Sequence, residues 1–572
     1  MAQDLGDRPW YGDWPQNVPK WIDFPKISLS DMLRESAASY PEDKAIVFLD
    51  SVMTYRELDD AVDRFATALA NLGLKKGDVL ALMLPNSFQF VITFYACQRL
   101  GMTATAINPT YKALEIKHHL NDSGAKALVV LDSVYAEAGR ILDQTQVKHL
   151  IGTNITDLVK MSGLKKWLGK KLGKIPTGQM PQGTLSYKQL LATAPNPPSV
   201  EIDPVNDIAA LQYTGGTTGT PKGAMLTSYN LVSNALSGKA WIGVNFPRDA
   251  GWVGVLPLFH VFAMTCCMNS AIASGGFMLL FPKPPDTMLE WAEQIQKWGK
   301  GTQLCMAGVA VLFNKINNTK GLEAYDLSPL TACLSGAGPL PRDVQMKFEE
   351  KIGAKVVEGY GLSESSPVVT ANPFVIPEGH ERVMGSIGIP FPNTDCKIMD
   401  LETGDNQLGY GPDQVGELCV KGPQVMKGYL NRPDETARTL RDGWLYTGDI
   451  AYMADNGYIF IMDRAKDLVK FKGFSVFPKE VEDYMFSHPD ILEVAVIGLP
   501  HPKVGEILKA FVVLQPDKVG QVSEDDIIAW CKENMTHYKV PSIVEFRDEL
   551  PKTMVGKVLR RVLKEEEAAK KV

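Results

Sequence analysis

Residues 208–227 read IAALQYTGGTTGTPKGAMLT, a short apolar stretch that runs directly into a loop of glycine, threonine and lysine. Between Tyr213 and Met225 there are four glycines, four threonines and the single lysine Lys222. Glycine lets the backbone approach a ligand closely, and hydroxyls, free backbone N–H groups and a lysine all bind phosphate oxygens. The stretch therefore predicts a β-strand that ends in a phosphate-binding loop.

This loop differs from the P-loop pattern G-x-x-x-x-G-K-[ST]. Counted from Gly216, Pro221 stands where the second glycine belongs, and Gly223 follows Lys222 where the magnesium-binding hydroxyl belongs. Pro221 also lacks a backbone N–H donor. We therefore expect a phosphate loop of another design.

Strand and helix patterns alternate on both sides of this loop, over residues 45–132 and again from 208 to about 395. Such alternation is typical of parallel sheets covered by helices. Short strands dominate 396–462, and the last hundred residues form a further compact unit. We predict an α/β fold with a large N-terminal domain (1–463) of parallel sheets flanked by helices plus a β-rich subdomain. A small, mobile α+β C-terminal domain (464–572) would follow.

The composition excludes several classes of protein. A chain of 572 residues is too long for one ordinary core. Its net charge of −7 argues against general nucleic-acid binding. The eight cysteines form no C-x-x-C pair, the N-terminal residues are unlike a signal peptide, and no apolar run is long enough to span a membrane. We expect a cytoplasmic protein with reduced thiols.

Three further stretches are ambiguous when taken singly. EGYGLSES (358–365) predicts a glycine turn, GWLYTGDI (443–450) predicts a β-turn at Asp449, and PKTMVGKVLRR (551–561) predicts a solvated basic surface. In this order and spacing, however, they resemble the adenylate-forming superfamily of acyl-CoA synthetases, peptide-synthetase adenylation domains and luciferases. The resemblance covers residues 30–563. LPLFHVFAMT (256–265) and GELCVKGPQVMKGYLNRPDET (416–436) are most similar to bacterial-type long-chain fatty acyl-CoA synthetases.

The resemblance implies a site for Mg²⁺ and ATP. Glu364 matches the magnesium ligand, Tyr360 the ring that stacks on adenine, and Asp449 and Arg464 the residues that hold the ribose. Ser363 stands where threonine is frequent and keeps the hydroxyl. The residues expected along the phosphates are Thr214, Gly215, Gly216, Thr217, Thr218, Gly219 and Lys222, and Gly359 and Gly361 flank the adenine-stacking ring.

The resemblance also implies two half-reactions, in which a fatty acid first forms an acyl-adenylate and coenzyme A then displaces AMP. Lys557 and His260 match residues that act on the carboxylate in the first step. Lys466 matches a hinge about which the small domain swings. The swing would bring Lys470, Lys472 and Gly473 to the reaction centre for the second step.

Several alternatives stay open at this stage. Medium-chain or aromatic, cinnamate-type acids could replace the long-chain acid, and a non-catalytic acyl or nucleotide sensor could use the same fold. A peptide-synthetase module is disfavoured, since no carrier domain follows. Luciferase chemistry and an oligomeric state are both compatible with the sequence.

Residues 160–175, KMSGLKKWLGKKLGKI, contain six lysines and no acidic residue. Met161, Leu164, Leu168, Leu172 and Ile175 are spaced to form one stripe of a helix, and Trp167 lies beside it. This pattern is typical of a helix that lies in a membrane interface. The alternative is a solvated helix whose stripe packs on the large domain.

Overall fold

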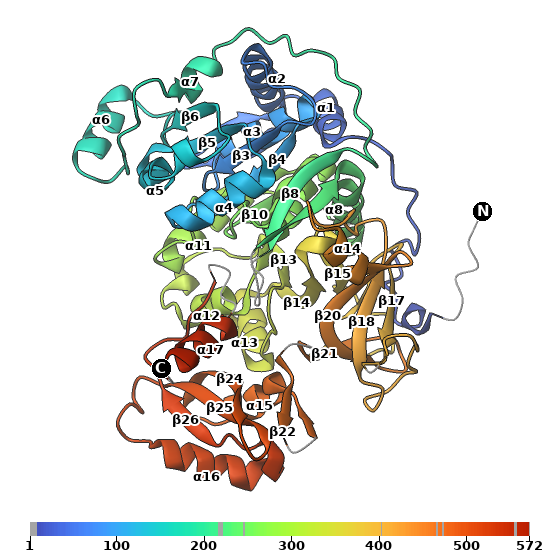
Figure 1. Cartoon of the computed structure of the whole chain (residues 1–572). Helices are drawn as coiled ribbons and strands as arrows, with labels where there is room; N and C mark the ends of the chain where they lie inside the picture. The colour runs from blue at the N-terminus through green and yellow to red at the C-terminus, as the bar shows by residue number, and fades with distance from the viewer. Residues whose placement is uncertain are drawn as a thin grey trace.

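The computed structural model describes residues 8–214, 221–243, 246–401, 403–464, 467–471, 474–553 and 558–570, and of Arg464, Phe474 and Ser475 only the backbone. Figure 1 shows a large body that contains the N-terminal four-fifths of the chain and a smaller C-terminal body below it. The large body contains three sheets and the small body one. The predicted α/β fold class is confirmed.

The phosphate-loop stretch belongs to a seven-stranded sheet with the strand order β7-β6-β5-β3-β4-β8-β9. All neighbouring pairs are parallel except β8 and β9, which form an antiparallel hairpin at the sheet edge. The strands are β3 (Val79–Met83), β4 (Thr103–Ala106), β5 (Ala127–Leu131), β6 (His149–Thr153), β7 (Leu185–Ser186), β8 (Ile208–Thr214) and β9 (Lys222–Thr227).

The second large sheet has nine strands in the order β16-β15-β14-β13-β12-β10-β11-β1-β2. It is parallel from β14 to β1, with antiparallel pairs at both edges. The strands are β1 (Lys44–Phe48), β2 (Ser51–Thr54), β10 (Gly251–Gly254), β11 (Phe277–Leu280), β12 (Leu304–Gly308), β13 (Leu330–Ser335), β14 (Lys355–Gly361), β15 (Val368–Ala371) and β16 (Ile389–Pro390).

Helices with one apolar face cover these sheets, and their ends follow local sequence signals. In α2 (Tyr55–Asn71), Thr54 and Glu57 form a capping box, as the sequence predicts for Thr54. All twelve residues of α3 (Phe88–Arg99) are buried, so this helix lies inside the large-domain core. The other helices of the large body are α1 (Leu29–Ser39), α4 (Ala113–Ser123), α5 (Tyr135–Gly139), α6 (Gly163–Lys171), α7 (Tyr187–Leu190), α8 (Ser228–Ile242), α9 (Val261–Ala263), α10 (Ser270–Ser274), α11 (Met288–Gly299), α12 (Ala310–Asn318), α13 (Arg342–Ile352) and α14 (Pro433–Thr439).

The β-rich unit predicted over 396–462 is present as a five-stranded antiparallel sheet. Its strands are β17 (Asp395–Met399), β18 (Gly416–Lys421), β19 (Leu440–Arg441), β20 (Trp444–Met453) and β21 (Ile459–Arg464). The turn predicted at Asp449 is wrong, because Asp449 lies within β20. Strand β20 pairs with β18 on one side and with β21 on the other. These pairings keep the strand continuous at Gly448, although the φ of Gly448 is +71°.

The small body has its own sheet and its own core. The strands are β22 (Val469–Phe471), β23 (Phe474–Val476), β24 (Ile491–His501), β25 (Gly505–Leu514) and β26 (Ile543–Phe546), and the helices are α15 (Pro478–Phe486), α16 (Glu524–Asn534) and α17 (Arg560–Ala569). Its two apolar clusters use only residues from Val469 onward. The predicted hinge residue Lys466 lies outside the described residues, and the boundary at 463/464 stays a prediction.

Candidate active site

The glycine-rich loop connects the two strands of the β8–β9 hairpin. Thr214, the last residue of β8, lies opposite Lys222, the first residue of β9. The loop residues Gly215, Gly216, Thr217, Thr218 and Gly219 lie outside the described residues. The hairpin therefore brings Thr214 and Lys222 side by side at the base of the predicted phosphate loop.

Side chains from α4 hold this hairpin in place. The Tyr213 hydroxyl donates to Asp122 Oδ2 at 2.7 Å, and the Tyr213 ring lies 3.9 Å from that of His119. His118 Nε2 donates to the carbonyl oxygen of Pro221 at 3.0 Å. Burial lowers the pKa of His119 to about 3, so this imidazole is neutral and structural. The two histidines thus support the β8–β9 hairpin.

On its other side, β9 pairs with the segment 427–430. Met225 N–H donates to the Gly428 carbonyl and Leu430 N–H donates to the Gly223 carbonyl, both at 2.9 Å. This pairing places Tyr429 beside the hairpin, where the Lys222 ammonium lies 5.1 Å from the centre of the Tyr429 ring. The sequence analysis did not assign a role to Tyr429.

Tyr429 links Lys222 to Glu364. Its hydroxyl donates to Glu364 Oε1 at 2.7 Å, and Lys222 forms an ion pair with Glu435 of α14. Burial and the Glu364 carboxylate both raise the pKa of the Tyr429 hydroxyl, which keeps it a hydrogen-bond donor. A cation and two carboxylates therefore meet beside the base of the loop.

A second pair of predicted residues meets at the end of β14. The Tyr360 hydroxyl donates to Asp449 Oδ2 at 2.6 Å, and Asp449 lies opposite Arg464 in the β20–β21 ladder. This bond fixes the orientation of the Tyr360 ring. Ser363 begins the short helix Ser363–Ser365, which also carries Glu364.

The glycines on either side of Tyr360 are required by close packing of the backbone. A Cβ on Gly361 would lie 2.1 Å from the Pro367 carbonyl oxygen, and one on Gly359 would lie 2.8 Å from Leu334 Cδ1. Since backbone at Pro367 cannot move aside as a flexible side chain would, Gly361 in particular admits no side chain. These glycines thus shape the end of β14 irrespective of any ligand.

His260 is half-buried at the start of α9, where its Nδ1 accepts the Phe262 N–H at 3.2 Å. The preceding carbonyl, that of Phe259, accepts from Gln212 of β8 at 2.9 Å. The turn that carries His260 is therefore tied to the strand that leads into the glycine loop.

A mainly apolar pocket lies between α8 and the nine-stranded sheet. Leu334, whose side chain packs against Gly359 of β14, is one of its lining residues. The lining residues are Asn234, Gly238, Trp241, Ile242, Trp252, Cys266, Ser270, Cys305, Met306, Ala307, Ala332, Leu334, Val368, Phe374 and Phe391. No motif in the sequence analysis indicated this set, because it comes from many separate elements.

The predicted residues of the small domain are only partly described. Lys470 is exposed on β22, and its backbone N–H donates to Glu506 Oε2 at 2.8 Å. Lys472, Gly473 and Lys557 lie outside the described residues. Among the described residues nearby, Lys552 and Val558 form an antiparallel bridge.

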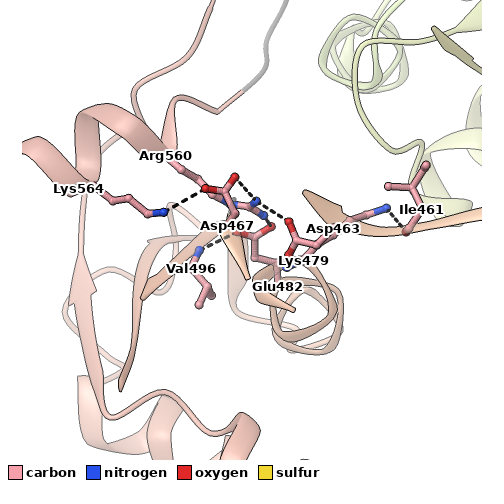
Figure 2. A network of polar contacts seen from close by, with 8 residues as sticks. All are labelled: Ile461, Asp463, Asp467, Lys479, Glu482, Val496, Arg560 and Lys564. Carbon is pink, nitrogen blue, oxygen red and sulfur yellow. Dashed lines mark hydrogen bonds and ion pairs between the residues drawn. The ribbon is translucent and has the colours of Figure 1, made fainter. Parts of the chain in front are cut away.

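A network of buried charges lies where β21 ends and the small domain begins, as Figure 2 shows. Arg560, the first residue of α17, donates to Glu482 Oε2 of α15 at 2.6 Å and to Asp463 Oδ1 of β21 at 3.0 Å. Asp467 accepts from Arg560 at 3.4 Å and from Lys564 at 3.1 Å. Arg560 is therefore surrounded by three carboxylates.

Lys479 adds two bonds across the same junction (Figure 2). Its backbone N–H donates to Asp463 Oδ2 at 2.6 Å, and its Nζ donates to the Ile461 carbonyl at 3.1 Å. The Asp463 side chain is 1% exposed. The end of β21 is thus bonded directly to α15 and α17 of the small domain.

The fold, a large domain of parallel sheets with a small domain joined to it just after β21, is that of an adenylate-forming enzyme. The model of the AMP-binding enzyme family matches residues 33–430, and that of the AMP-binding enzyme C-terminal domain matches residues 480–557. The chain belongs to the AMP-binding enzyme family.

Full-length relatives agree with this assignment. The chain is 39% identical over 568 residues to a long-chain-fatty-acid–CoA ligase of Escherichia coli O157:H7, covering 98% of both chains. It is 38% identical to the Bacillus subtilis (strain 168) protein of the same name, again with 98% of each covered. Among solved structures, an anthranilate CoA ligase in complex with anthranoyl-AMP superposes with a TM-score of 0.80 at 25% identity, covering 95% of this chain and 98% of that one.

Proposed function

We propose that this protein ligates a long-chain fatty acid to coenzyme A, with ATP as the energy source and an acyl-adenylate as the intermediate. The observation that carries the proposal is the assembly of Tyr360, Asp449, Glu364 and Lys222 around the end of β14, next to an apolar pocket. The names of the relatives at 38–39% identity support the long-chain substrate.

Each predicted site residue of the large domain has a role in nucleotide binding. Tyr360 stacks on adenine, since its hydroxyl bond to Asp449 holds the ring in one orientation. Asp449 and Arg464 hold the ribose, and Lys222 with the loop from Thr214 to Gly219 holds the phosphates. Lys222 would exchange its ion pair with Glu435 for a phosphate oxygen on ATP binding.

The residues present suit a magnesium ion that is held mainly by the phosphate oxygens of ATP. Magnesium in nucleotide enzymes is bound by one or two carboxylates together with phosphate oxygens and waters. Within the described part of the chain, no group of three or more His, Cys, Asp or Glu side chains could hold a metal by itself. Glu364, held by Tyr429 through one oxygen, suits the role of the single carboxylate ligand. The ion would offset phosphate charge while ATP is bound.

In the first step, the fatty carboxylate attacks the α-phosphorus of ATP and pyrophosphate leaves. His260 and Lys557 orient the carboxylate and offset the charge that develops, a type of stabilisation that is worth about 2.7–4 kcal/mol per donor in other enzymes. In the second step the coenzyme A thiolate attacks the acyl carbon and AMP leaves. Lys470, Lys472 and Gly473 serve this step.

The apolar pocket favours an aliphatic tail over a small aromatic acid. Its lining residues include Trp241, Trp252 and Phe391, and also Leu334, which packs against Gly359 of β14. A fatty chain gains stability with each methylene that it buries there, at about 0.8 kcal/mol each. A cinnamate-type acid would leave much of this surface without a partner.

The small domain turns about Lys466 between the two steps. Asp463 lies before this residue, whereas Lys479 and Arg560 lie after it, so a turn at Lys466 must break the bonds of Asp463 to both. The network in Figure 2 would thus hold one of the two orientations. We place the enzyme in the cytoplasm, with a peripheral contact to the membrane. Among the described residues, no helix has the length and apolar character to span a bilayer.

The test is pyrophosphate release by the purified chain, measured with fatty acids from butyrate to arachidate and with cinnamate, with and without coenzyme A. We expect activity to rise with chain length and the thioester to form only with coenzyme A. Highest activity with cinnamate would favour an aromatic acid ligase. Nucleotide binding with no pyrophosphate release on any acid would favour a sensor.

The variant Glu364→Gln tests whether Glu364 is a ligand of the magnesium ion. The amide keeps the bond from Tyr429 but removes the ligand charge, so the magnesium concentration for half-maximal release should rise. Glu435→Gln, which removes the ion-pair partner of Lys222 instead, should leave the magnesium requirement unchanged. Equal magnesium curves for Glu364→Gln and the unchanged protein would remove Glu364 from the metal site.

A further inference from the structure

Helix α6 lies at the outer edge of the large domain, far from the small domain in Figure 1. It spans Gly163–Lys171, and the Ser162 side chain accepts the Lys165 N–H at its start. The segment around it, residues 158–200, contains seven lysines and no acidic residue in a chain of net charge −7. This helix plays no part in the nucleotide site described above.

The side of α6 that faces the protein is marked by Lys166 and Gly169, which are half-buried. Gly169 packs on Ile175, since a Cβ there would lie 2.6 Å from Ile175 Cδ1, and Ile175 is buried. Successive residues of an α-helix are about 100° apart, so the opposite side carries Leu164, Trp167 and Leu168 with Lys171 among them, and Leu172 lies at its edge. The apolar side of α6 therefore points away from the protein.

These four residues are exposed to an extent that is unusual for apolar side chains. Leu164 is 68% exposed, Trp167 57%, Leu168 40% and Leu172 66%. The alternative in which the stripe packs on the large domain is wrong for them and holds only for Ile175. An amphipathic helix whose apolar face is turned to solvent is typical of an interaction surface.

Both ends of the segment are fixed to the large domain. The Lys160 N–H donates to Ser51 Oγ at 2.8 Å, and Asn154 Nδ2 donates to the Pro176 carbonyl at 2.9 Å. Ile175 adds a buried apolar anchor. The outward orientation of the apolar face is therefore set by the fold and needs no partner to form.

The lysines of α6 lie among and beside the exposed apolar residues, and their acidic neighbours, Asp157 near Lys166 and Asp132 near Lys170, are beyond ion-pair distance. Within the described residues, Lys160 is the one lysine of this segment with a carboxylate within ion-pair distance, Glu57 at 3.3 Å. Lys171 Nζ lies 5.0 Å from the centre of the Trp167 ring, so its charge sits beside the apolar face. Lys165 and Lys170 are exposed on the two sides of this face.

We propose that α6 and the lysines around it are a docking surface for an anionic lipid bilayer. The apolar face would enter the boundary between headgroups and acyl chains, while the lysine side chains reach up to anionic headgroups. A second copy of the chain fits poorly, because a twofold contact would set the same lysines against each other. At nine residues, the helix lies on the membrane and cannot cross it.

The test is co-sedimentation of the full chain with vesicles of phosphatidylcholine alone and of phosphatidylcholine with 30% phosphatidylglycerol, at low and high salt. We expect binding to the anionic vesicles that weakens as salt rises. Changing Lys165, Lys166, Lys170 and Lys171 to Glu should weaken that binding by about tenfold or more. Changing Leu164, Trp167 and Leu172 to Ser should abolish the part of binding that persists at high salt.

The control for net charge changes four exposed lysines elsewhere, Lys300, Lys320, Lys503 and Lys532, to Glu. This variant has the same total charge and should sediment like the unchanged protein. Equal sedimentation of the α6 charge variant and the unchanged protein on anionic vesicles at low salt would overturn the proposal. A dimer of the chain that forms without lipid and is lost in the Leu164, Trp167 and Leu172 variant would also overturn it.

The result does not depend on the proposed enzymatic activity, since binding is measured without substrates. All α6 variants should keep the pyrophosphate release of the unchanged protein on a soluble, short-chain acid. Loss of vesicle binding with full release therefore tests the surface alone.

Discussion

Residues 551–561 and 160–175 are two basic stretches that look alike in the sequence but have opposite environments in the structure. In the first, Arg560 is enclosed by Asp463, Asp467 and Glu482, and its side chain is 16% exposed. In the second, Lys165 and Lys170 are exposed to solvent. The first stretch forms contacts between the two domains, and the lysines of the second stretch are exposed to solvent.

The difference shows that lysine and arginine content does not predict whether a basic stretch is exposed to solvent. The prediction of a solvated basic surface at 551–561 is wrong for Arg560, because the acids that surround it come from positions 78–97 residues away. Among the described residues, no carboxylate lies within ion-pair distance of the α6 lysines, in a segment with no acidic residue from 158 to 200. Four predictions test this contrast.

The largest effect should follow from Arg560→Met. Removing the guanidinium leaves three carboxylates without their shared partner, and breaking a buried ion pair in this way costs about 3–5 kcal/mol. We expect the small domain to unfold at lower urea concentration, measured by hydrogen exchange of the β24 and β25 amides. The neighbouring Arg561 lies 3.7 Å from Glu565 at the surface, so Arg561→Ala should change stability by less than about 1 kcal/mol. Equal effects of the two variants would contradict the buried network.

Lys557→Ala should affect chemistry rather than stability, although Lys557 lies in the same basic stretch. Adenylation should fall by about 10²–10³-fold, as for the loss of one preorganised donor. Thioester formation from supplied acyl-adenylate should be largely retained. Lys552→Ala, which removes an ion pair with Glu493, is the control and should leave both steps intact. An equal loss in both half-reactions of folded Lys557→Ala would argue against two orientations of the small domain.

A buried acid at the domain junction should make stability depend on pH. Burial raises the pKa of Glu358 in β14 to about 7, and Lys479 of the small domain partly opposes this shift. The folded state therefore holds a proton that the unfolded state releases at lower pH, so this group destabilises the fold as pH rises from about 4.5 to 7.

Glu358→Gln should remove this dependence. Relative to the unchanged protein, the variant should gain up to about 3 kcal/mol between pH 5 and pH 8, from 1.36 kcal/mol per pKa unit. Urea unfolding at the two pH values measures the gain. The exposed Glu381→Gln is the control, and its stability curve should stay parallel to that of the unchanged protein. A parallel curve for Glu358→Gln as well would show that Glu358 is ionised in the folded state.

The smallest effect should come from α6. Replacing Lys165, Lys170 and Lys171 by Gln removes no ion pair among the described residues, so each change should alter stability by less than about 0.5 kcal/mol. Thermal unfolding of the triple variant checks this. A loss as large as that of Arg560→Met would show that these lysines have structural partners, and the contrast between the two stretches would fail.

Much of the fold follows from local sequence signals. Strand β8 occupies the predicted residues 208–214, and the predicted cap at Thr54 is completed by Glu57 three residues later. Such features depend on neighbours within a turn of helix or along one strand, so the sequence alone specifies them. The turn predicted at Asp449 is wrong because strands on both sides of β20 override the glycine signal.

The residues of the candidate site were named from the sequence, but the contacts between them were not. Tyr429 and Glu435 lie in a stretch that carried the family resemblance, yet their contacts with Glu364 and Lys222 arise only when 427–430 pairs with β9. His118 Nε2 donates to the Pro221 carbonyl, a support of the β8–β9 hairpin that no sequence motif indicated. A tyrosine directly after a glycine, as in KGYLN, offered the one local signal.

By itself, the sequence determined the strand that leads into the glycine-rich stretch, the alternation of strands and helices, and the family to which the chain belongs. Each of these depends on residue types at short, fixed spacings. The tertiary structure alone decided that Arg560 is buried among carboxylates while the apolar face of α6 points outward. The reason is physical: the energy of a charge or of an apolar face depends on what surrounds it, and here the surroundings come from distant parts of the chain, 97 residues away for Asp463 and 109 for Ser51.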